Sequence, residues 1–234
     1  MKLAPDIDAL CAVLRAACLA DDAVGGMIHL ISEDGCRYIA HVDLSDDFLA
    51  RFASVTVGDG TTISQVLVDR RRVAVRNIAE DEGFAPYREV AAEAGVVAIQ
   101  STPVGNGGRQ YLYGVLTTCY DRPHHPDASV SEILDACADL AAKIVAANEI
   151  EEMIEARKKS SSMSAGSAEM TTAVARATAI VETLLPLCEK APSLELLEAA
   201  DEKLGVIVEE LARRAHSQGP RPEDVEPIGH IHCA

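Results

Sequence analysis

Tryptophan is absent from this 234-residue sequence, and aromatic residues make up only 3% of it. Hydrophobic residues still account for 48%, so the core must be built mainly from Ala, Val, Leu and Ile. No apolar run approaches the ~20 residues of a membrane span, and Asp6 and Asp8 interrupt the start of the chain before a signal peptide could form. We therefore expect a soluble, cytoplasmic protein that makes no membrane contact.

Basic residues are also scarce, because 21 Lys and Arg stand against 37 Asp and Glu, for a net charge of −16. Nucleic-acid binding depends on cations that neutralise phosphates, so this charge argues against DNA or RNA as a partner. The tight basic cluster at 70–72 falls between an expected helix and an expected strand, and we interpret it as a solvated turn.

Seven cysteines are scattered without C-x-x-C spacing, so neither a zinc site nor a disulfide framework is expected. Cys36 follows Gly35 in an expected turn and is the candidate for the most exposed thiol. No nucleophilic triad, phosphate-binding loop or kinase signature occurs. The sequence therefore assigns no catalytic residue.

Histidine pairs are the remaining candidates for metal ligands. His124 and His125 lie between prolines, where we expect a loop rather than a metal site. His230, His232 and Cys233 could chelate a soft metal, but on a flexible tail such binding is more often adventitious. We predict no metal site, and the role of this tail stays open.

Hydrophobic periodicity predicts helices and short strands in alternation along the first part of the chain. Residues 6–20 have the 3–4 residue spacing of an amphipathic helix. The remaining expected elements, in order, are a hairpin at 25–31 and 36–42, helices at 45–53 and 61–69, a strand at 73–76, a loop-rich stretch at 77–94, and a hairpin at 98–104 and 111–120.

From about residue 127 the pattern stays helical for some thirty residues. Its apolar positions repeat as in a coiled coil, with Glu151 in the missing slot: Ile133, Cys137, Leu140, Ile144, Ala147 and Ile154. The first half should cover a sheet. The second half extends beyond it, as a frayed end or as a two-chain coiled coil, and the repeat predicts a homodimer through the terminal helices of the domain.

A Ser-rich break at 158–168 divides the chain into a folded domain at 1–157 and a helical hairpin at 169–216, followed by a flexible tail at 217–234. Each hairpin helix has one apolar stripe. Because so few residues seldom form a core alone, we expect the hairpin to pack on the domain or on a second copy.

Several motifs occur in one order along residues ~5–157, and together they resemble the GAF sensory domains of bacterial signalling proteins. The resemblance implies an α+β fold, in which an antiparallel sheet has the terminal helices on one face and a pocket roof formed by residues 45–95 on the other. The motifs are RVAV at 72–75, IAEDEGF at 78–84, AGV at 94–96, AIQSTPV at 98–104, YGVLTT at 113–118 and RPHHP at 122–126.

The resemblance implies a ligand pocket between the sheet and that roof. Alternate side chains of the strand 98–104 face opposite sides, and we assign Ile99 and Ser101 to the side that faces the pocket. The candidate ligand-binding residues are His41, Phe52, Thr62, Ser64, Ile99, Ser101, Thr117 and Cys119. Neither the ligand nor a cofactor can be named.

For function, the resemblance implies a non-enzymatic regulatory module that senses a small molecule and signals through its terminal helices to a dimer mate or a separate output protein. One alternative is a scaffold with a vestigial pocket. The other is a thiol reductase of the GAF type, which needs a reactive thiolate and a resolving partner near the pocket. Neither 61–66 nor 77–95 contains a cysteine, which disfavours the reductase.

Overall fold

Six strands form one antiparallel sheet in the order β3-β2-β1-β6-β5-β4. The computed structural model describes residues 6–32, 35–105, 111–160, 175–176, 178–180, 182–186 and 192–217. The strands are β1 (Gly25–Ser32), β2 (Gly35–Val42), β3 (Ser54–Val55), β4 (Val73–Val75), β5 (Ala98–Gly105) and β6 (Leu112–Tyr120).

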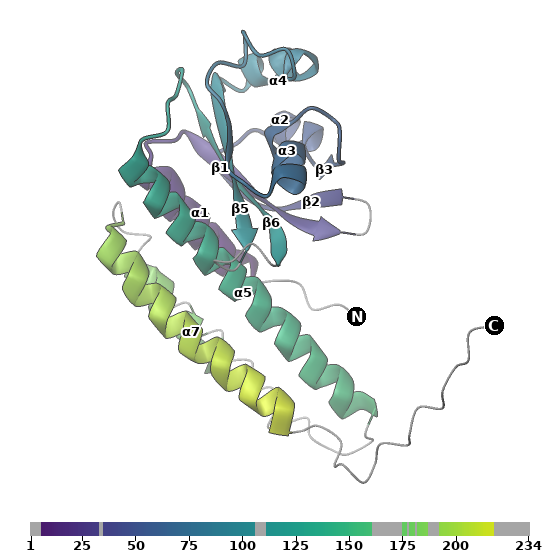
Figure 1. Ribbon diagram of the computed structural model, residues 1–234, viewed down its shortest axis with the longest axis vertical. Helices are drawn as coiled ribbons and strands as arrows, with labels where there is room; N and C mark the ends of the chain where they lie inside the picture. The colour runs from purple at the N-terminus through teal and green to yellow at the C-terminus, as the bar shows by residue number, and fades with distance from the viewer. Residues whose placement is uncertain are drawn as a thin grey trace, which may run out of the picture.

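Helices cover both faces of this sheet (Figure 1). One face carries α1 (Ile7–Ala20) and α5 (Ala128–Ser160), with α7 (Leu194–Ser217) alongside α5. The other face carries α2 (Asp46–Arg51), α3 (Thr62–Asp69), the 3-10 turn η1 (Ala85–Tyr87) and α4 (Arg88–Glu93). The predicted α+β class and the two-sided arrangement are confirmed.

Local capping explains where these helices begin. The Asp6 carboxylate accepts the N–H of Ala9 at 3.1 Å, and Thr61 Oγ1 accepts the N–H of Ser64 at 3.1 Å. Such caps satisfy backbone donors that have no partner inside the helix. Helix α3 then ends at Arg70, whose φ of 54° stops the helix by turning the backbone left-handed.

Two separate cores fill the space on either side of the sheet. On the α1 and α5 side the core is aliphatic and rich in alanine, and Ala16, Ala17 and Ala141 are fully buried, so the two helices can lie close to the strands. On the other side all three phenylalanines of the chain, Phe48, Phe52 and Phe84, pack under the short helices. All three phenylalanines thus lie in one layer, whereas Tyr113 packs against the core on the other side.

Cys36 corrects one prediction made from the sequence. Cys36 lies at the start of β2 as the predicted hairpin requires, but it pairs with Ile31 and Val55 and is fully buried, so the expected exposure of its thiol is wrong. Burial raises the pKa of its thiol to about 11. Successive side chains of a strand point to opposite faces, and this alternation, not the proximity of Cys36 to Gly35, decides whether the thiol is exposed.

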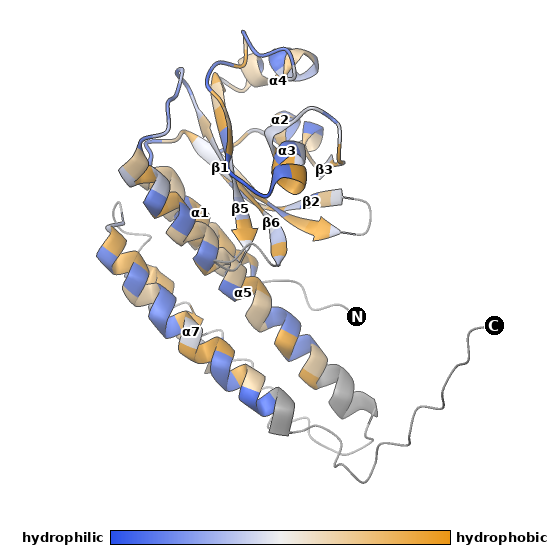
Figure 2. Cartoon of the chain, viewed as in Figure 1, coloured by the Kyte–Doolittle hydropathy of each residue, from blue (hydrophilic) through white to orange (hydrophobic). Residues whose placement is uncertain are grey.

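The C-terminal helices pack on α5 of the same chain, which is one of the two placements that the sequence left open. The described residues within 175–186 are helical, and Ile180 and Leu184 join the aliphatic core together with Leu197 and Leu204 of α7. Figure 2 shows hydrophobic and hydrophilic residues alternating along α7, as its single apolar stripe requires.

The second half of α5 is therefore covered within one chain. Ile144 is fully buried and Ile154 is 7% exposed, so the structure shows neither a frayed end nor a surface open to a second copy at these positions. The domain boundary at 158–168 stays a prediction. Most of that linker and the predicted tail, including His230, His232 and Cys233, lie outside the described residues. None of the described helices is long and apolar enough to cross a membrane.

Gly114 offers a test of the pairing between β1 and β6. A Cβ atom added there would lie 2.0 Å from the carbonyl oxygen of His29, and that carbonyl belongs to the paired strand β1. We expect Gly114→Ala to lower the free energy of unfolding by about 3 kcal/mol or more in urea titrations, because backbone must move.

Gly205 on α7 provides the matched control, since nothing lies within 4 Å of a Cβ added there. Gly205→Ala should leave the fold intact and add up to about 1 kcal/mol from helix propensity. Equal and small effects of the two substitutions would contradict the strand register described above.

Candidate functional site

A chain of three hydroxyl groups lies between the sheet and α3. Thr62 Oγ1 is 2.8 Å from Ser101 Oγ, which is 2.9 Å from Thr117 Oγ1. Ser101 and Thr117 are register partners on β5 and β6, and Thr62 is the first residue of α3. All three side chains are fully buried, and the hydroxyls satisfy one another's hydrogen bonding inside a layer that is mostly apolar.

His29 on β1 belongs to the same layer and was missed from the sequence. It is fully buried, and its Nε2 lies 2.6 Å from the carbonyl oxygen of Phe52. A carbonyl can only accept, so Nε2 must carry the hydrogen and Nδ1 is left as an acceptor. Among the described residues, nothing donates a hydrogen bond to Nδ1. Burial lowers the pKa of His29, against the opposing effect of the bond to Phe52.

The sequence did contain a signal for His29. In a strand, residues two apart face the same side, and Met27 of the same strand is a buried member of the aromatic core. A histidine on that face of an apolar strand must find a partner in the core. The partner is a backbone carbonyl that no sequence pattern marks.

Aromatic rings form the roof above this group. Phe52 and Tyr87 stack with ring centroids 5.2 Å apart, and Phe84 lies 5.7 Å from Tyr87. Tyr87 donates its hydroxyl hydrogen to the carbonyl of Asp59 at 3.2 Å. Arg51 lies 4.8 Å above the Tyr87 ring. The roof is therefore attached through Tyr87 to the loop that precedes α3.

The structure brings six of the eight predicted residues into this layer: Phe52, Thr62, Ile99, Ser101, Thr117 and Cys119. Ser64 is also buried, but its hydroxyl accepts the N–H of Gly58 at 2.9 Å and so supports the loop before α3. His41 is exposed on β2, with its ring 5.9 Å from that of Tyr38, and lies apart from the buried group.

The thiols of this layer are poorly suited to nucleophilic chemistry. Cys36 and Cys119 are both fully buried, and burial raises the pKa of each thiol. A thiol with a raised pKa holds little of the reactive thiolate at neutral pH. No group of three or more His, Cys, Asp or Glu side chains among the described residues could hold a metal ion. The polar side chains of the layer can instead form hydrogen bonds, as the three hydroxyls and His29 do.

The opposite face of β5 connects to α5 through Arg72. Its Nε donates to Thr102 Oγ1 at 3.2 Å, and its Nη2 donates to the carbonyl of Ser131 at 2.7 Å and to Asp135 Oδ1 at 2.5 Å. The side chain of Arg72 is only 18% exposed. The predicted solvated turn at 70–72 therefore contains one arginine that joins the sheet to the first turns of α5.

The opposite face of β6 connects to the end of α1. Tyr120 shares a hydrogen bond of 2.7 Å with Thr118 and donates to Asp21, the residue that ends α1. His124 stacks on the Tyr120 ring at 3.7 Å, and its Nε2 lies 3.2 Å from Asp21 Oδ2. This half of the His124–His125 pair is thus a structural member of a loop, as the sequence indicated.

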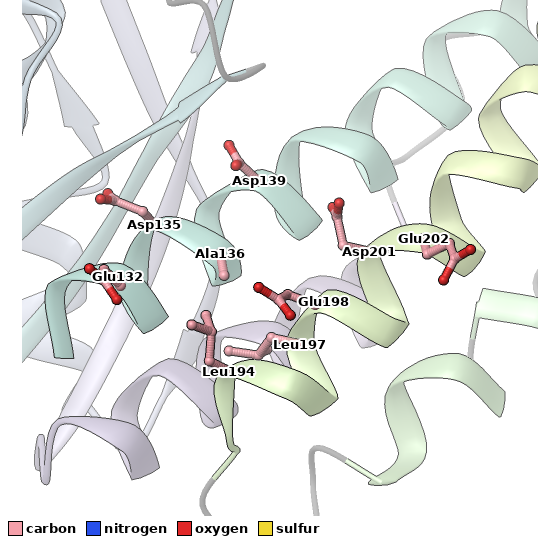
Figure 3. Close-up of a pocket in the computed structure, with 9 residues that line it drawn as sticks. All are labelled: Glu132, Asp135, Ala136, Asp139, Leu194, Leu197, Glu198, Asp201 and Glu202. Carbon is pink, nitrogen blue, oxygen red and sulfur yellow. The ribbon is translucent and has the colours of Figure 1, made fainter. Parts of the chain in front are cut away.

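A depression of about 360 Å³ lies between α5 and α7 (Figure 3). Carboxylates line both of its walls, over a floor that includes Leu194 and Leu197. Lys143 of α5 pairs with Asp201 of α7 beside it. Burial, followed by the nearby carboxylate of Asp201, raises the pKa of Asp139. The lining carboxylates are Glu132, Asp135, Asp139, Glu198, Asp201 and Glu202.

A family model described as the GAF domain matches residues 6–146. None of the curated proteins matches the chain. Solved structures show a similar fold. The GAF domain of a phosphoenolpyruvate-protein phosphotransferase from Coxiella burnetii is 19% identical with a TM-score of 0.51, over 62% of this chain and 86% of that one.

A GAF domain/HD domain protein from Geobacter sulfurreducens is 13% identical with a TM-score of 0.51, over 62% of this chain and 95% of that one. A type II free methionine-R-sulfoxide reductase from Thermoplasma acidophilum is 14% identical with a TM-score of 0.44, over 56% of this chain and 94% of that one. At these identities the first two structures show that the fold is shared.

The lowered pKa of His29 makes stability depend on pH. Below about pH 6.5 the unfolded chain binds a proton that the folded chain resists. The contribution of neutral His29 to the free energy of unfolding should be complete at pH 7. It should fall by up to about 1.4 kcal/mol per pH unit below pH 6.5. Urea titrations between pH 7 and 5.5 should show this slope in the wild type and a smaller one in His29→Gln. His125 is exposed, so His125→Gln should keep the wild-type slope, and identical slopes for all three proteins would contradict the burial of His29.

Proposed function

Since the chain belongs to the GAF domain family through residues 6–146, we propose that it is a non-enzymatic regulatory module that senses a small molecule. The observation that carries the proposal is the set of buried polar side chains in this layer, which are His29 and the hydrogen-bonded Thr62, Ser101 and Thr117. A core that served stability alone would favour Leu or Ile at such positions, because buried polar atoms cost free energy wherever they lack a partner.

The same group suggests the chemistry of the ligand. His29 Nδ1 is an acceptor with no donor among the described residues, so a ligand that offers an N–H or O–H group would satisfy it. The hydroxyls of Ser101 and Thr117 can both donate and accept, and the stacked rings of Phe52 and Tyr87 offer an apolar surface. We propose a small polar molecule with an apolar part.

Strands β5 and β6 provide the route to the output. Ser101 and Thr117 face the polar group, whereas Thr102 and Thr118 of the same strands contact Arg72 and Tyr120 on the helix side. A ligand with different affinity for two helix arrangements would shift their populations. We propose that this shift reaches a dimer mate or a separate output protein through α1 and α5.

The raised pKa values of Cys36 and Cys119 support the non-enzymatic part of the proposal over a thiol reductase. A variant with Ser at every cysteine except Cys119, which lies in the proposed binding layer, should keep ligand binding, whereas a reductase that used any of those thiols would lose its turnover. The described cysteines are all free thiols, which fits a reducing compartment, and we propose that the protein works in the cytoplasm.

Ser101→Leu tests the site directly. Native mass spectrometry of the freshly purified wild type should show an added small-molecule mass, and Ser101→Leu should remove it while the chain stays folded. We expect a loss of about 1–3 kcal/mol in stability, because the larger side chain overpacks the layer and breaks two hydrogen bonds.

Ser54 is exposed on β3, so Ser54→Leu is the matched control and should keep the bound mass. Two results together would favour the scaffold with a vestigial pocket: a wild type without a bound small molecule, and a melting temperature that no compound of a metabolite library changes.

A further inference from the structure

Gln100 of β5 is a fully buried amide without a hydrogen-bond partner among the described residues. It is 1% exposed, and neither its Nε2 nor its Oε1 bonds to any atom in that part of the chain. A buried amide of this kind costs free energy unless a partner satisfies it, and nearly all buried polar side chains in proteins have one. One donor and one acceptor are therefore available together at a single buried position.

The side chain of Gln100 faces the helix side of the sheet. It lies two residues from Thr102, whose hydroxyl contacts Arg72 on that side, and residues two apart in a strand share a face. The register partners of Gln100 are Thr118 of β6 and Ala74 of β4. Thr102 and Thr118 are each 1% exposed. The amide thus has one buried hydroxyl along its own strand and another directly across from it.

The hydrogen bond on the Thr102 side has a fixed direction. Arg72 Nε donates to Thr102 Oγ1 at 3.2 Å, and a guanidinium group can only donate. The oxygen of Thr102 therefore accepts, and the hydrogen of its hydroxyl is left to be donated. The next polar side chain along this face of β5 is Gln100, whose Oε1 can accept.

The hydrogen bonds on the Thr118 side have the same direction. Tyr120 donates to Asp21, because a carboxylate can only accept. Burial raises the pKa of Tyr120, so its hydroxyl keeps that hydrogen at neutral pH. The bond of 2.7 Å between Thr118 and Tyr120 must then be donated by Thr118. The oxygen of Thr118 is left to accept, and Gln100 Nε2 can donate.

Gln100 bonds directly to neither threonine, so a molecule that both donates and accepts is required to connect them. Water has this capacity, and a buried water typically makes about three hydrogen bonds to polar groups that would otherwise be unsatisfied. Ala74 is small and exposed, and it lies on the edge strand β4 beside Gln100. It offers water a path from the solvent to the amide.

We propose that Gln100 is the centre of a buried water site, and that water bound there completes a one-way chain of hydrogen bonds from Arg72 to Asp21. The oxygen of the amide faces Thr102 through water, and the nitrogen faces Thr118 through water. Each bond of such a chain polarises the next and strengthens it.

The chain would join two helices across the sheet. Arg72 also donates to the carbonyl of Ser131 and to Asp135, both on α5, and Asp21 is the residue that ends α1. The site lies on the face of β5 opposite to Ser101. The proposal therefore does not depend on small-molecule binding, whose failure would be seen in native mass spectra.

Nuclear Overhauser spectra of the full-length wild type test the water site directly. The side-chain amide hydrogens of Gln100 should show transfer to a water that tumbles with the protein. Gln65 is exposed on α3, so its amide hydrogens should show no such transfer and provide the control. A Gln100 amide that contacts no long-lived water would overturn the proposal.

Gln100→Met gives a second test, because methionine has nearly the same length and lacks both polar atoms. If water satisfies the amide, the substitution loses hydrogen bonds and should lower the equilibrium constant for folding about tenfold in urea titrations. An unsatisfied amide would be a cost that methionine removes, so an unchanged or raised constant would overturn the proposal. Gln65→Met is the control at an exposed position and should leave the constant nearly unchanged.

Thr102→Val and Thr118→Val test the chain, because valine has the shape of threonine without its hydroxyl. The two threonines are not register partners, so their effects on the folding constant should simply multiply if no chain connects them. With the chain, either substitution already interrupts it, and the double variant should lose less than that product. This difference should disappear in the Gln100→Met background. Independent effects in the wild-type background would overturn the chain.

Discussion

The pairing of β6 with β1 on one side and β5 on the other is the constraint on which the rest of the structure depends. It brings Ser101 opposite Thr117 and Val115 opposite His29. Because side chains alternate along a strand, the same register that gathers polar atoms under α3 also directs Thr102 and Thr118 to the helix side. A slip of one residue would exchange the contents of the two layers.

Local sequence patterns predicted most of the elements and their order, but they missed strand β3 (Ser54–Val55) and gave helix α4 (Arg88–Glu93) only as part of a loop-rich stretch. Asp6 and Thr61 begin their helices because their side chains can accept backbone N–H groups, and both signals are visible in the sequence. Strand alternation and the family resemblance together placed Ser101 and Thr117 in the buried layer. The resemblance extended the interpretation from single elements to a shared site.

Contacts between distant segments account for what the sequence could not predict. The hydrogen-bond partner of His29 is the carbonyl of Phe52. The partners of Arg72 are a threonine and a helix that lie more than twenty residues away in sequence. Glu151 interrupted the heptad pattern, yet only the packed structure reveals Arg176 as its counter-ion. Pairings of this kind depend on how layers meet in space, and no local spacing encodes them.

The placement of all three phenylalanines in one layer has a practical consequence for spectroscopy. The chain contains no tryptophan, whereas Phe84 and Phe52 lie against Tyr87 in the roof. A tryptophan placed at Phe84 would be the single indole of the protein, with no background emission to subtract. Its fluorescence would report on the roof alone, so movement of that layer could be followed in real time, separately from events in the helices on the far side of the sheet.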